Sequence, residues 1–221
     1  MEKTYRTELV FVLDRSGSMS GLEADTIGGF NAMLQKQKAQ PGEVTVTTVL
    51  FDDRYELLHD RMEIRAIAPV TDREYYVRGC TALLDAMGRT IDKIATVQRR
   101  SAPEHRADKV LFVITTDGME NASREYSYQR IRAMVERQKA EFGWDFLFLG
   151  ANIDAIATAR RFGIREDRAV NYHADHEGTR LNYQVVSDAI THVRTCSAPM
   201  AANWKADIEK DYKNRKAGKR N

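Results

Sequence analysis

The stretch Glu8-Leu-Val-Phe-Val-Leu-Asp14 decides the fold. Its apolar residues are contiguous rather than alternating with polar ones, which is typical of a strand buried on both faces of a parallel sheet. A second stretch, Lys109-Val-Leu-Phe-Val-Ile-Thr-Thr-Asp117, has the same form. Each run ends in an aspartate, so the sequence predicts two buried strands with a carboxylate at each carboxyl end.

The segments around these two runs alternate between strand and helix character. Further strand-like segments are residues 44–51, 145–150 and 169–172. Residues 55–58 follow the first of these after a short turn, which predicts an antiparallel edge strand. Apolar residues recur at helical spacing in five regions: 22–39, 83–97, 128–135, 153–162 and 181–193. This order predicts an α/β fold of Rossmann-like, doubly wound type, with a mostly parallel sheet, one antiparallel edge strand and helices on both faces.

The pair Gly28-Gly29 falls inside the first predicted helix. Each internal glycine costs about 1 kcal/mol relative to alanine. We therefore interpret the pair as a point of close packing against the sheet.

Length and composition favour one domain with a distinct end. The 221 residues contain no linker between about residues 6 and 195, so we divide the chain into one domain, 1–200, and a basic C-terminal tail, 201–221. We expect the tail to form a short frayed helix. After Asp211 the tail has five basic residues and no acidic one: Lys213, Arg215, Lys216, Lys219 and Arg220.

The charge balance disfavours nucleic-acid binding by overall charge. The chain has 34 basic and 32 acidic residues, a net charge of +2. The longest apolar runs are far shorter than the roughly 18 residues that span a bilayer, and the N-terminus lacks a signal-peptide pattern. Cys80 and Cys196 are too few and too far apart for a disulfide scaffold. We expect a soluble, cytoplasmic protein that does not bind membranes.

Oxygen-bearing side chains gather where the predicted strands end. Asp14, Ser16 and Ser18 alternate directly after the first strand, Asp117 ends the later strand, and Thr81 precedes a strong helix. Ligands of open α/β sheets bind outside the carboxyl ends of the strands. Taken singly, the hydroxyl residues are also ordinary helix N-caps.

Together these segments resemble the von Willebrand factor type A domain. The matching segments are Asp14-Arg-Ser-Gly-Ser18-Met19, Gly79-Cys-Thr-Ala-Leu83 and Thr116-Asp-Gly118. The resemblance covers about residues 6–195, and all five positions of the family's metal-ion-dependent adhesion site match. Phe51-Asp-Asp53 and Asp117-Gly-Met-Glu-Asn121 resemble bacterial and phage members with a single stand-alone domain. Cys80 departs from the family, where many members carry glycine.

The resemblance implies a role for each matched residue. Ser16, Ser18 and Thr81 would donate hydroxyl oxygens to a divalent cation, and Asp14 and Asp117 would bind it directly or through water. The donor set suits Mg²⁺, and Mn²⁺ or Ca²⁺ would also be accepted. An Asp or Glu of a protein partner would complete the coordination. The resemblance therefore implies a binding module and not an enzyme.

Two other functions stay open on the sequence. A strand ending in Asp14 resembles the nucleophile strand of haloacid-dehalogenase-like phosphatases, with Asp117 as a Mg²⁺ ligand, but Ser16 stands where that family has its second acid. A nucleic-acid adaptor would use the basic tail, and its binding would be weak and salt-sensitive.

Two further signals favour plain structural explanations. The stretch His173-Ala-Asp-His176-Glu177 lacks nearby cysteines or a second ligand pair, which favours a solvated loop over a zinc site. Cys80 lies beside the proposed cation site, and we interpret it as a small buried residue rather than a reactive thiol.

Overall fold

The computed structural model describes residues 5–218, and the side chains to residue 216. Its centre is one six-stranded sheet of order β3-β2-β1-β4-β5-β6. The strands are β1 (Thr7–Asp14), β2 (Val44–Phe51), β3 (Tyr55–Glu63), β4 (Lys109–Thr116), β5 (Asp145–Ala151) and β6 (Ala169–Tyr172). The main helices are α1 (Glu23–Lys38), α2 (Leu83–Arg100), α3 (Tyr128–Phe142), α4 (Ala155–Arg161), α5 (His176–Thr195) and α6 (Ala206–Gly218).

The sheet has the predicted mixture of parallel and antiparallel pairs. β1 pairs in parallel with β2 and β4, and β5 pairs in parallel with β4 and β6. Only the β2–β3 pair, at one edge, is antiparallel. The apolar residues of β1, Leu9 to Leu13, are buried because helices cover both faces of this central strand. The predicted fold class is confirmed.

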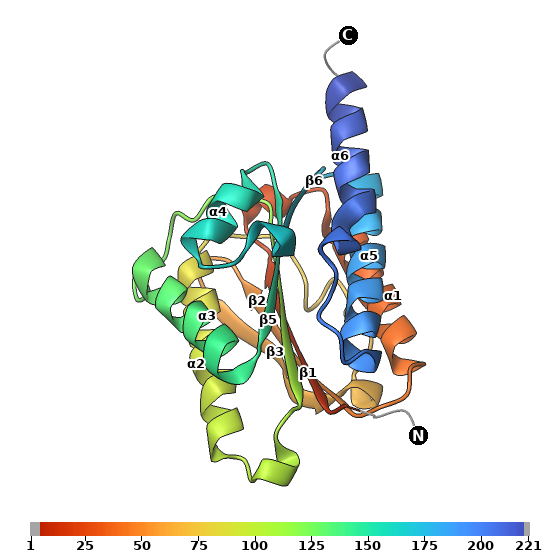
Figure 1. Ribbon diagram of the computed structural model, residues 1–221. Helices are drawn as coiled ribbons and strands as arrows, with labels where there is room; N and C mark the ends of the chain where they lie inside the picture. Colours follow the sequence, from red (N-terminus) through yellow and green to blue (C-terminus); the bar gives the residue numbers. More distant parts are fainter. Residues whose placement is uncertain (1–4, 219–221) are drawn as a thin grey trace.

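Two hydrophobic layers enclose the sheet (Figure 1). On one face α1 and α5 pack against the sheet, and on the other face lie α2, α3 and α4. Of the glycine pair in α1, only Gly29 makes a close contact, and this contact is with another helix. A Cβ on Gly29 would lie 2.3 Å from the Tyr183 ring of α5. Gly29 therefore brings the two helices of one layer together. Helix α1 does pack on the sheet, through Phe30, whose ring centroid lies 5.2 Å from that of Phe11 on β1, and not through the glycines.

The edge strand β3 is longer than the predicted residues 55–58. It continues to Glu63 through His59-Asp-Arg-Met-Glu63, a polar stretch without strand alternation. Two tertiary contacts hold this extension. His59 Nδ1 lies 2.9 Å from Thr48 Oγ1 on β2, and Arg61 Nε donates to the buried carboxylate of Glu8 on β1. Such long-range polar contacts leave no local sequence pattern.

The C-terminal segment differs from the expected frayed helix and tail. Helix α6 packs beside β6 and α5, with Ile208 buried in the core. Trp204 Nε1 donates to Asp167 O at 2.7 Å, and Lys205 Nζ donates to Ala169 O at 2.7 Å. These contacts anchor the helix start on β6. Lys219 and Arg220 lie outside the described residues, and the division at residue 200 stays a prediction.

No helix among residues 5–218 combines the length and apolarity needed to cross a membrane.

Candidate metal centre

Three chain segments meet at the carboxyl ends of β1 and β4. They are the loop after Asp14, the segment that leads to Thr81 before α2, and the turn after Thr116. Gly17 N donates to Gly79 O at 3.1 Å, which joins the first two segments. A Cβ on Gly17 would lie 3.4 Å from the same carbonyl, so this is a close backbone approach. Parallel strands therefore bring together residues separated by about a hundred positions.

The three predicted hydroxyl ligands form one cluster. Ser16 Oγ lies 3.0 Å from Ser18 Oγ and accepts a hydrogen bond from Thr81 Oγ1 at 2.9 Å. A Cβ on Gly118 would lie 2.9 Å from Ser18 Oγ and 3.0 Å from Thr81 Oγ1. A glycine is therefore needed where the turn after β4 approaches the hydroxyls.

The hydroxyl residues do not serve as helix caps. α1 begins after Leu22 and α2 after Ala82, neither with a side-chain cap, and Ser16 makes no capping bond to the short turn that follows it. The N-cap alternative is therefore wrong for Ser16, Ser18 and Thr81. Their side chains are directed to one another instead of to free backbone N–H groups.

Asp14 is buried beneath this cluster. Its Oδ1 accepts from Ser16 N at 2.7 Å, and its Oδ2 accepts from Thr116 Oγ1 at 2.6 Å. Burial raises the pKa of Asp14, although these hydrogen bonds oppose the rise. Thr116 orients the carboxylate; it begins the motif Thr116-Asp-Gly118, but the sequence argument assigned it no role.

Asp117 is the second buried carboxylate, with 3% of its surface exposed. It accepts a hydrogen bond from Asn152 Nδ2 at the end of β5. The pKa of Asp117 is raised to about 6: burial is the main cause, the Asn152 hydrogen bond opposes the rise, and the charge of Asp14 adds to it. Asn152 was also missed by the sequence argument. Its left-handed backbone (φ 52°) is visible only in the structure.

Neither buried acid has a positively charged partner. No lysine or arginine among residues 5–216 forms an ion pair with Asp14 or Asp117. Two uncompensated carboxylates in a buried site are costly. A divalent cation would supply the missing positive charge, and carboxylate and hydroxyl oxygens are the hard donors that Mg²⁺, Mn²⁺ and Ca²⁺ prefer. The residues present therefore fit a divalent cation.

The described residues contain no cluster of three or more His, Cys, Asp and Glu side chains suited to a metal. The candidate centre has only two carboxylates, and its other donors are hydroxyls. The predicted site set, Asp14, Ser16, Ser18, Thr81 and Asp117, comes together in space, while metal binding itself stays a prediction.

Two expectations for nearby residues are wrong. Cys80 is exposed rather than buried. The stretch 173–177 is no solvated loop: Asp175 caps α5 by accepting from Gly178 N, and His173 stacks on Tyr212 of α6. The sequence signal for this cap is Asp175 directly before a helical pattern. The sequence argument weighed only zinc binding against a loop and missed it.

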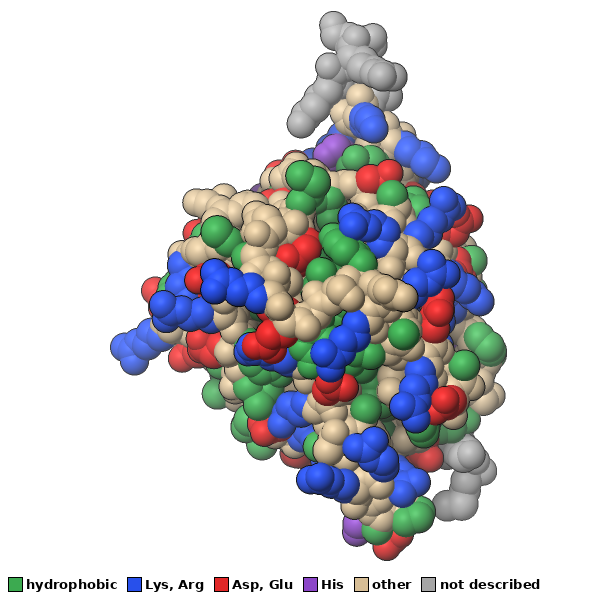
Figure 2. Space-filling view, turned by 90° about the vertical axis from the view of Figure 1, so that its left-hand side faces the viewer, with side chains coloured by type: hydrophobic (Ala, Val, Ile, Leu, Met, Phe, Trp, Pro, Cys, Tyr) green, Lys and Arg blue, Asp and Glu red, His purple; other side chains and the backbone are tan. Residues whose placement is uncertain are grey.

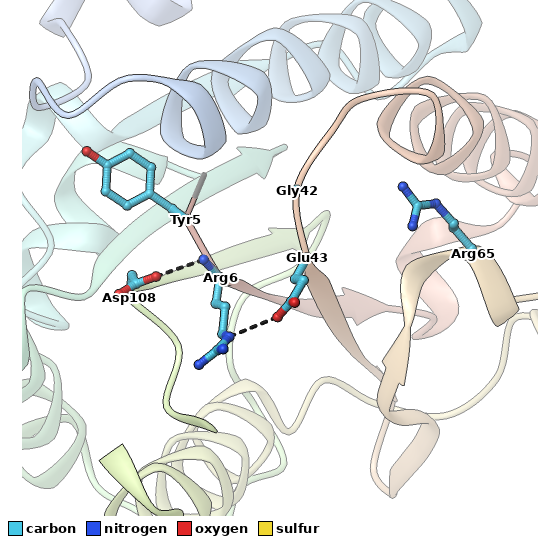
Figure 3. A pocket seen from close by; sticks show the side chains of 6 residues that line it. All are labelled: Tyr5, Arg6, Gly42, Glu43, Arg65 and Asp108. Atoms are coloured by element: carbon cyan, nitrogen blue, oxygen red, sulfur yellow. Dashed lines mark hydrogen bonds and ion pairs between the residues drawn. The ribbon is translucent and has the colours of Figure 1, made fainter. Parts of the chain in front are cut away.

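A cavity lies at the opposite end of the sheet (Figure 3). Its volume is about 530 Å³, and residues before β1, β2 and β4 line it. Arg6 Nε pairs with Glu43 at 2.8 Å, and Arg6 N donates to Asp108 at 2.8 Å. Arg6 and the two acids thus pair with one another, and Arg65 is the remaining charged residue of the lining.

Comparison with known proteins identifies the fold. No protein-family model and no curated protein matches the chain. Among solved structures, it is similar to the vWF domain of the type V pili tip protein Mfa5 from Porphyromonas gingivalis (TM-score 0.60, 12% identity, 90% of this chain and 99% of that chain). It is also similar to proximal thread matrix protein 1 from the mussel byssus (TM-score 0.55, 15% identity, 83% and 46%) and to the ArnB paralog VWA2 from Sulfolobus acidocaldarius (0.52, 16%, 86% and 46%).

These similarities define the fold as that of von Willebrand factor type A domains. The chain spans less than half the length of the mussel and Sulfolobus structures. A further structure of the mussel protein has a zinc-occupied metal-ion-dependent adhesion site. At identities this low, the likeness shows the fold and leaves the chemistry to the residues of the site itself.

Proposed function

We propose that this protein is a divalent-metal-dependent protein-binding module. Ser16, Ser18 and Thr81 hold the cation with their hydroxyl oxygens, and Asp14 and Asp117 bind it directly or through water. The observation that carries the proposal is the pair of buried carboxylates without a cationic partner, next to the Ser16 hydroxyl and the two hydroxyls bonded to it. The zinc-occupied site of the mussel protein supports metal binding in this fold.

The donor set favours recognition of an acidic side chain. Neutral hydroxyl ligands leave a divalent ion most of its positive charge, so an Asp or Glu of a partner protein completes the coordination. Mg²⁺ is the proposed ion because it retains waters and needs few carboxylates, and Mn²⁺ or Ca²⁺ would substitute.

The site favours binding over catalysis. Asp14 is buried, and both of its oxygens accept hydrogen bonds, so it is poorly placed as the nucleophile of a phosphatase. The second acid that such an enzyme needs is replaced by Ser16, which is itself bonded to two hydroxyls. We therefore propose that the protein is not an enzyme.

The nucleic-acid alternative has little support from charge distribution. Arg215 of the basic segment pairs with Asp211 and Asp175. The molecular face over α2, α3 and α4 carries positive and negative side chains side by side (Figure 2). No extended basic surface lies there. The cytoplasmic location and the stand-alone bacterial or phage type stay predictions.

The decisive experiment measures stabilisation by metal. We expect Mg²⁺ at a hundred times its dissociation constant to stabilise the protein by about 2.7 kcal/mol, which raises Tm by roughly 5–10 °C for a domain of this size. Calorimetric titration of Mg²⁺ gives the dissociation constant directly.

The matched pair Thr81→Val and Thr90→Val tests the site. Both remove a buried threonine hydroxyl, but Thr90 Oγ1 bonds Ala86 O within α2 and Tyr55 Oη at 3.5 Å, and neither partner belongs to the hydroxyl cluster. Thr81→Val should abolish the Mg²⁺ response, and Thr90→Val should retain it. A wild-type protein that neither binds Mg²⁺, Mn²⁺ or Ca²⁺ nor gains stability from them would disprove the proposal.

A further inference from the structure

Two exposed hydrophobic side chains flank the candidate metal centre in the sequence. Among residues 5–216 the exposed large hydrophobic residues are Met62, Tyr76, Met119 and Phe142. Met119, 75% exposed, is two residues after Asp117, and Tyr76, 41% exposed, lies in the segment that leads to Thr81. A single exposed hydrophobic residue needs no explanation, but two of them on ligand-bearing loops point to a contact surface.

The Tyr76 ring is held by two arginines. The guanidinium carbons of Arg15 and Arg78 each lie 5.2 Å from the ring centroid, and Arg78 Nη1 donates to Tyr76 Oη at 3.0 Å. Both arginines are fixed in turn by the buried carboxylate of Asp52, at 3.0 Å and 2.6 Å. A preorganised aromatic ring loses little entropy when a partner binds, which suits a contact residue.

The turn that carries Met119 is also fixed. On one side, Gly118 lies against the hydroxyls of Ser18 and Thr81. On the other side, the Glu120 carboxylate accepts from Leu84 N at 2.9 Å and from Ser123 N at 2.8 Å. The backbone around Met119 is therefore anchored, while its side chain extends into solvent.

The charged groups near Tyr76 are already paired. Arg78 is bonded to Asp52 and lies 3.8 Å from Glu56, and Arg15 pairs with both acids. The two arginines that hold Tyr76 are therefore not free to bind an acidic partner. The metal would be the cation that meets an acidic residue, and apolar side chains would surround it.

We infer that Tyr76 and Met119 form an apolar rim that selects the partner. The inference rests on the proposed function: the partner contributes one Asp or Glu to the metal, and apolar residues next to that acid pack against Tyr76 and Met119. Such packing excludes water from the metal–carboxylate contact and strengthens it, as apolar surroundings do at interaction hot spots. The partner is thus a protein segment with an isolated acid in an apolar setting.

Selection from phage-displayed random dodecapeptides tests the inference. The wild-type protein is immobilised with Mg²⁺, and bound phage are eluted with EDTA. We expect the eluted peptides to be enriched in Asp or Glu, and in Leu, Ile, Val, Phe or Met within two positions of the acid.

Single-residue variants distinguish the contribution of the apolar rim to peptide selection from that of the metal. In Met119→Ser and Tyr76→Ser we expect the acid to remain enriched and the neighbouring apolar residues to lose their enrichment. Phe142→Ser, which removes an exposed hydrophobic residue from the end of α3, is the matched control and should select like the wild type. Mg²⁺ titration should give dissociation constants within twofold of wild type for all three variants.

The outcomes distinguish the rim from the proposed function. Acid-enriched peptides without apolar neighbours, or apolar enrichment that both rim variants retain, would overturn the rim and leave the metal module standing. If EDTA releases no acid-enriched peptides from the wild type, both proposals fail.

Discussion

Two groups of buried acids lie at the same end of the sheet, and the protein neutralises only one of them. Asp52, at the end of the β2 strand, accepts from Arg15 Nε at 3.0 Å and from Arg78 Nε at 2.6 Å. Asp14 and Asp117, at the ends of the adjacent strands β1 and β4, have hydroxyl, amide and backbone partners but no cation. Both groups are buried to a similar degree.

The pKa values of the two groups move in opposite directions. Burial alone would raise the pKa of Asp52, but hydrogen bonds from Arg78 and Arg54 N and the charge of Arg15 lower it overall. The pKa of Asp117 is raised to about 6, with burial as the main cause. The comparison teaches that a structural acid here receives its own arginines, whereas the acids of the candidate metal centre leave the counter-charge to an external cation.

The largest expected effect comes from removing the arginine of the neutralised group. Arg15→Met should lower the free energy of unfolding by about 3–5 kcal/mol, because it leaves a buried carboxylate with half of its positive charge gone. Arg65→Met is the control: Arg65 is exposed and only 3.8 Å from Glu63, so its loss should cost under about 0.5 kcal/mol. Urea denaturation measures both.

If Arg15→Met does not yield folded protein, Glu56→Gln replaces it. Glu56 is partly exposed and pairs with Arg15 Nη2 at 2.6 Å, so this variant weakens the same group more mildly. Equal stability of the Arg15 and Arg65 variants would contradict the structural role assigned to the Asp52 group.

A smaller effect is expected from pH on the metal-free protein. The pKa of Asp117 rises from 3.8 to about 6 on folding, so the folded state binds its proton more tightly than the unfolded state. Stability is therefore lost as the pH rises from about 4 to about 6, by about 3 kcal/mol from this residue. Denaturation in EDTA between pH 4 and 8, for wild type and Asp117→Asn, isolates the contribution.

The informative quantity is the difference in the free energy of unfolding between the wild type and Asp117→Asn. It should change between pH 4 and 6 and level off above, because the asparagine does not titrate. In saturating Mg²⁺ the trend should reverse in the wild type, since metal requires the ionised carboxylate. If the difference in unfolding free energy stays constant with pH in EDTA, folding does not raise the pKa of Asp117.

The smallest effect should come from the Tyr75 hydroxyl, which connects the segment held by the Asp52 group to the metal-centre residue Asp14. Tyr75 Oη donates to Asp14 O at 2.6 Å, in the segment that Arg15 and Arg78 fix. Tyr75→Phe should cost about 1 kcal/mol in stability. It should also weaken Mg²⁺ binding about threefold to tenfold, since the segment positions Thr81.

Tyr183→Phe is a close control. The Tyr183 hydroxyl is also buried but has no hydrogen-bond partner among the described residues. Its removal should leave stability and Mg²⁺ affinity nearly unchanged. A Tyr75→Phe variant that loses stability but binds Mg²⁺ like wild type would limit Tyr75 to a structural role.

The fold was largely predictable because its signals are local. The apolar runs of β1 and β4 and the helical spacing of α2 and α5 specify buried strands and covering helices over short windows. The polar half of β3 and the anchored helix α6 were not predictable to the same extent. Arg61 and Lys205, which stabilise them, act through partners distant in the sequence.

The same division runs through the candidate site. By itself the sequence marked the candidate residues: Asp14, Ser16, Ser18 and Asp117 stand at or just after strand ends, and Thr81 stands before a helix in a short motif. Only the tertiary structure decided what surrounds them, including Thr116 and Asn152 on the carboxylates and the exposure of Cys80. The physical reason is that hydrophobic periodicity is written in consecutive residues, whereas burial and charge compensation depend on neighbours brought together from separate strands.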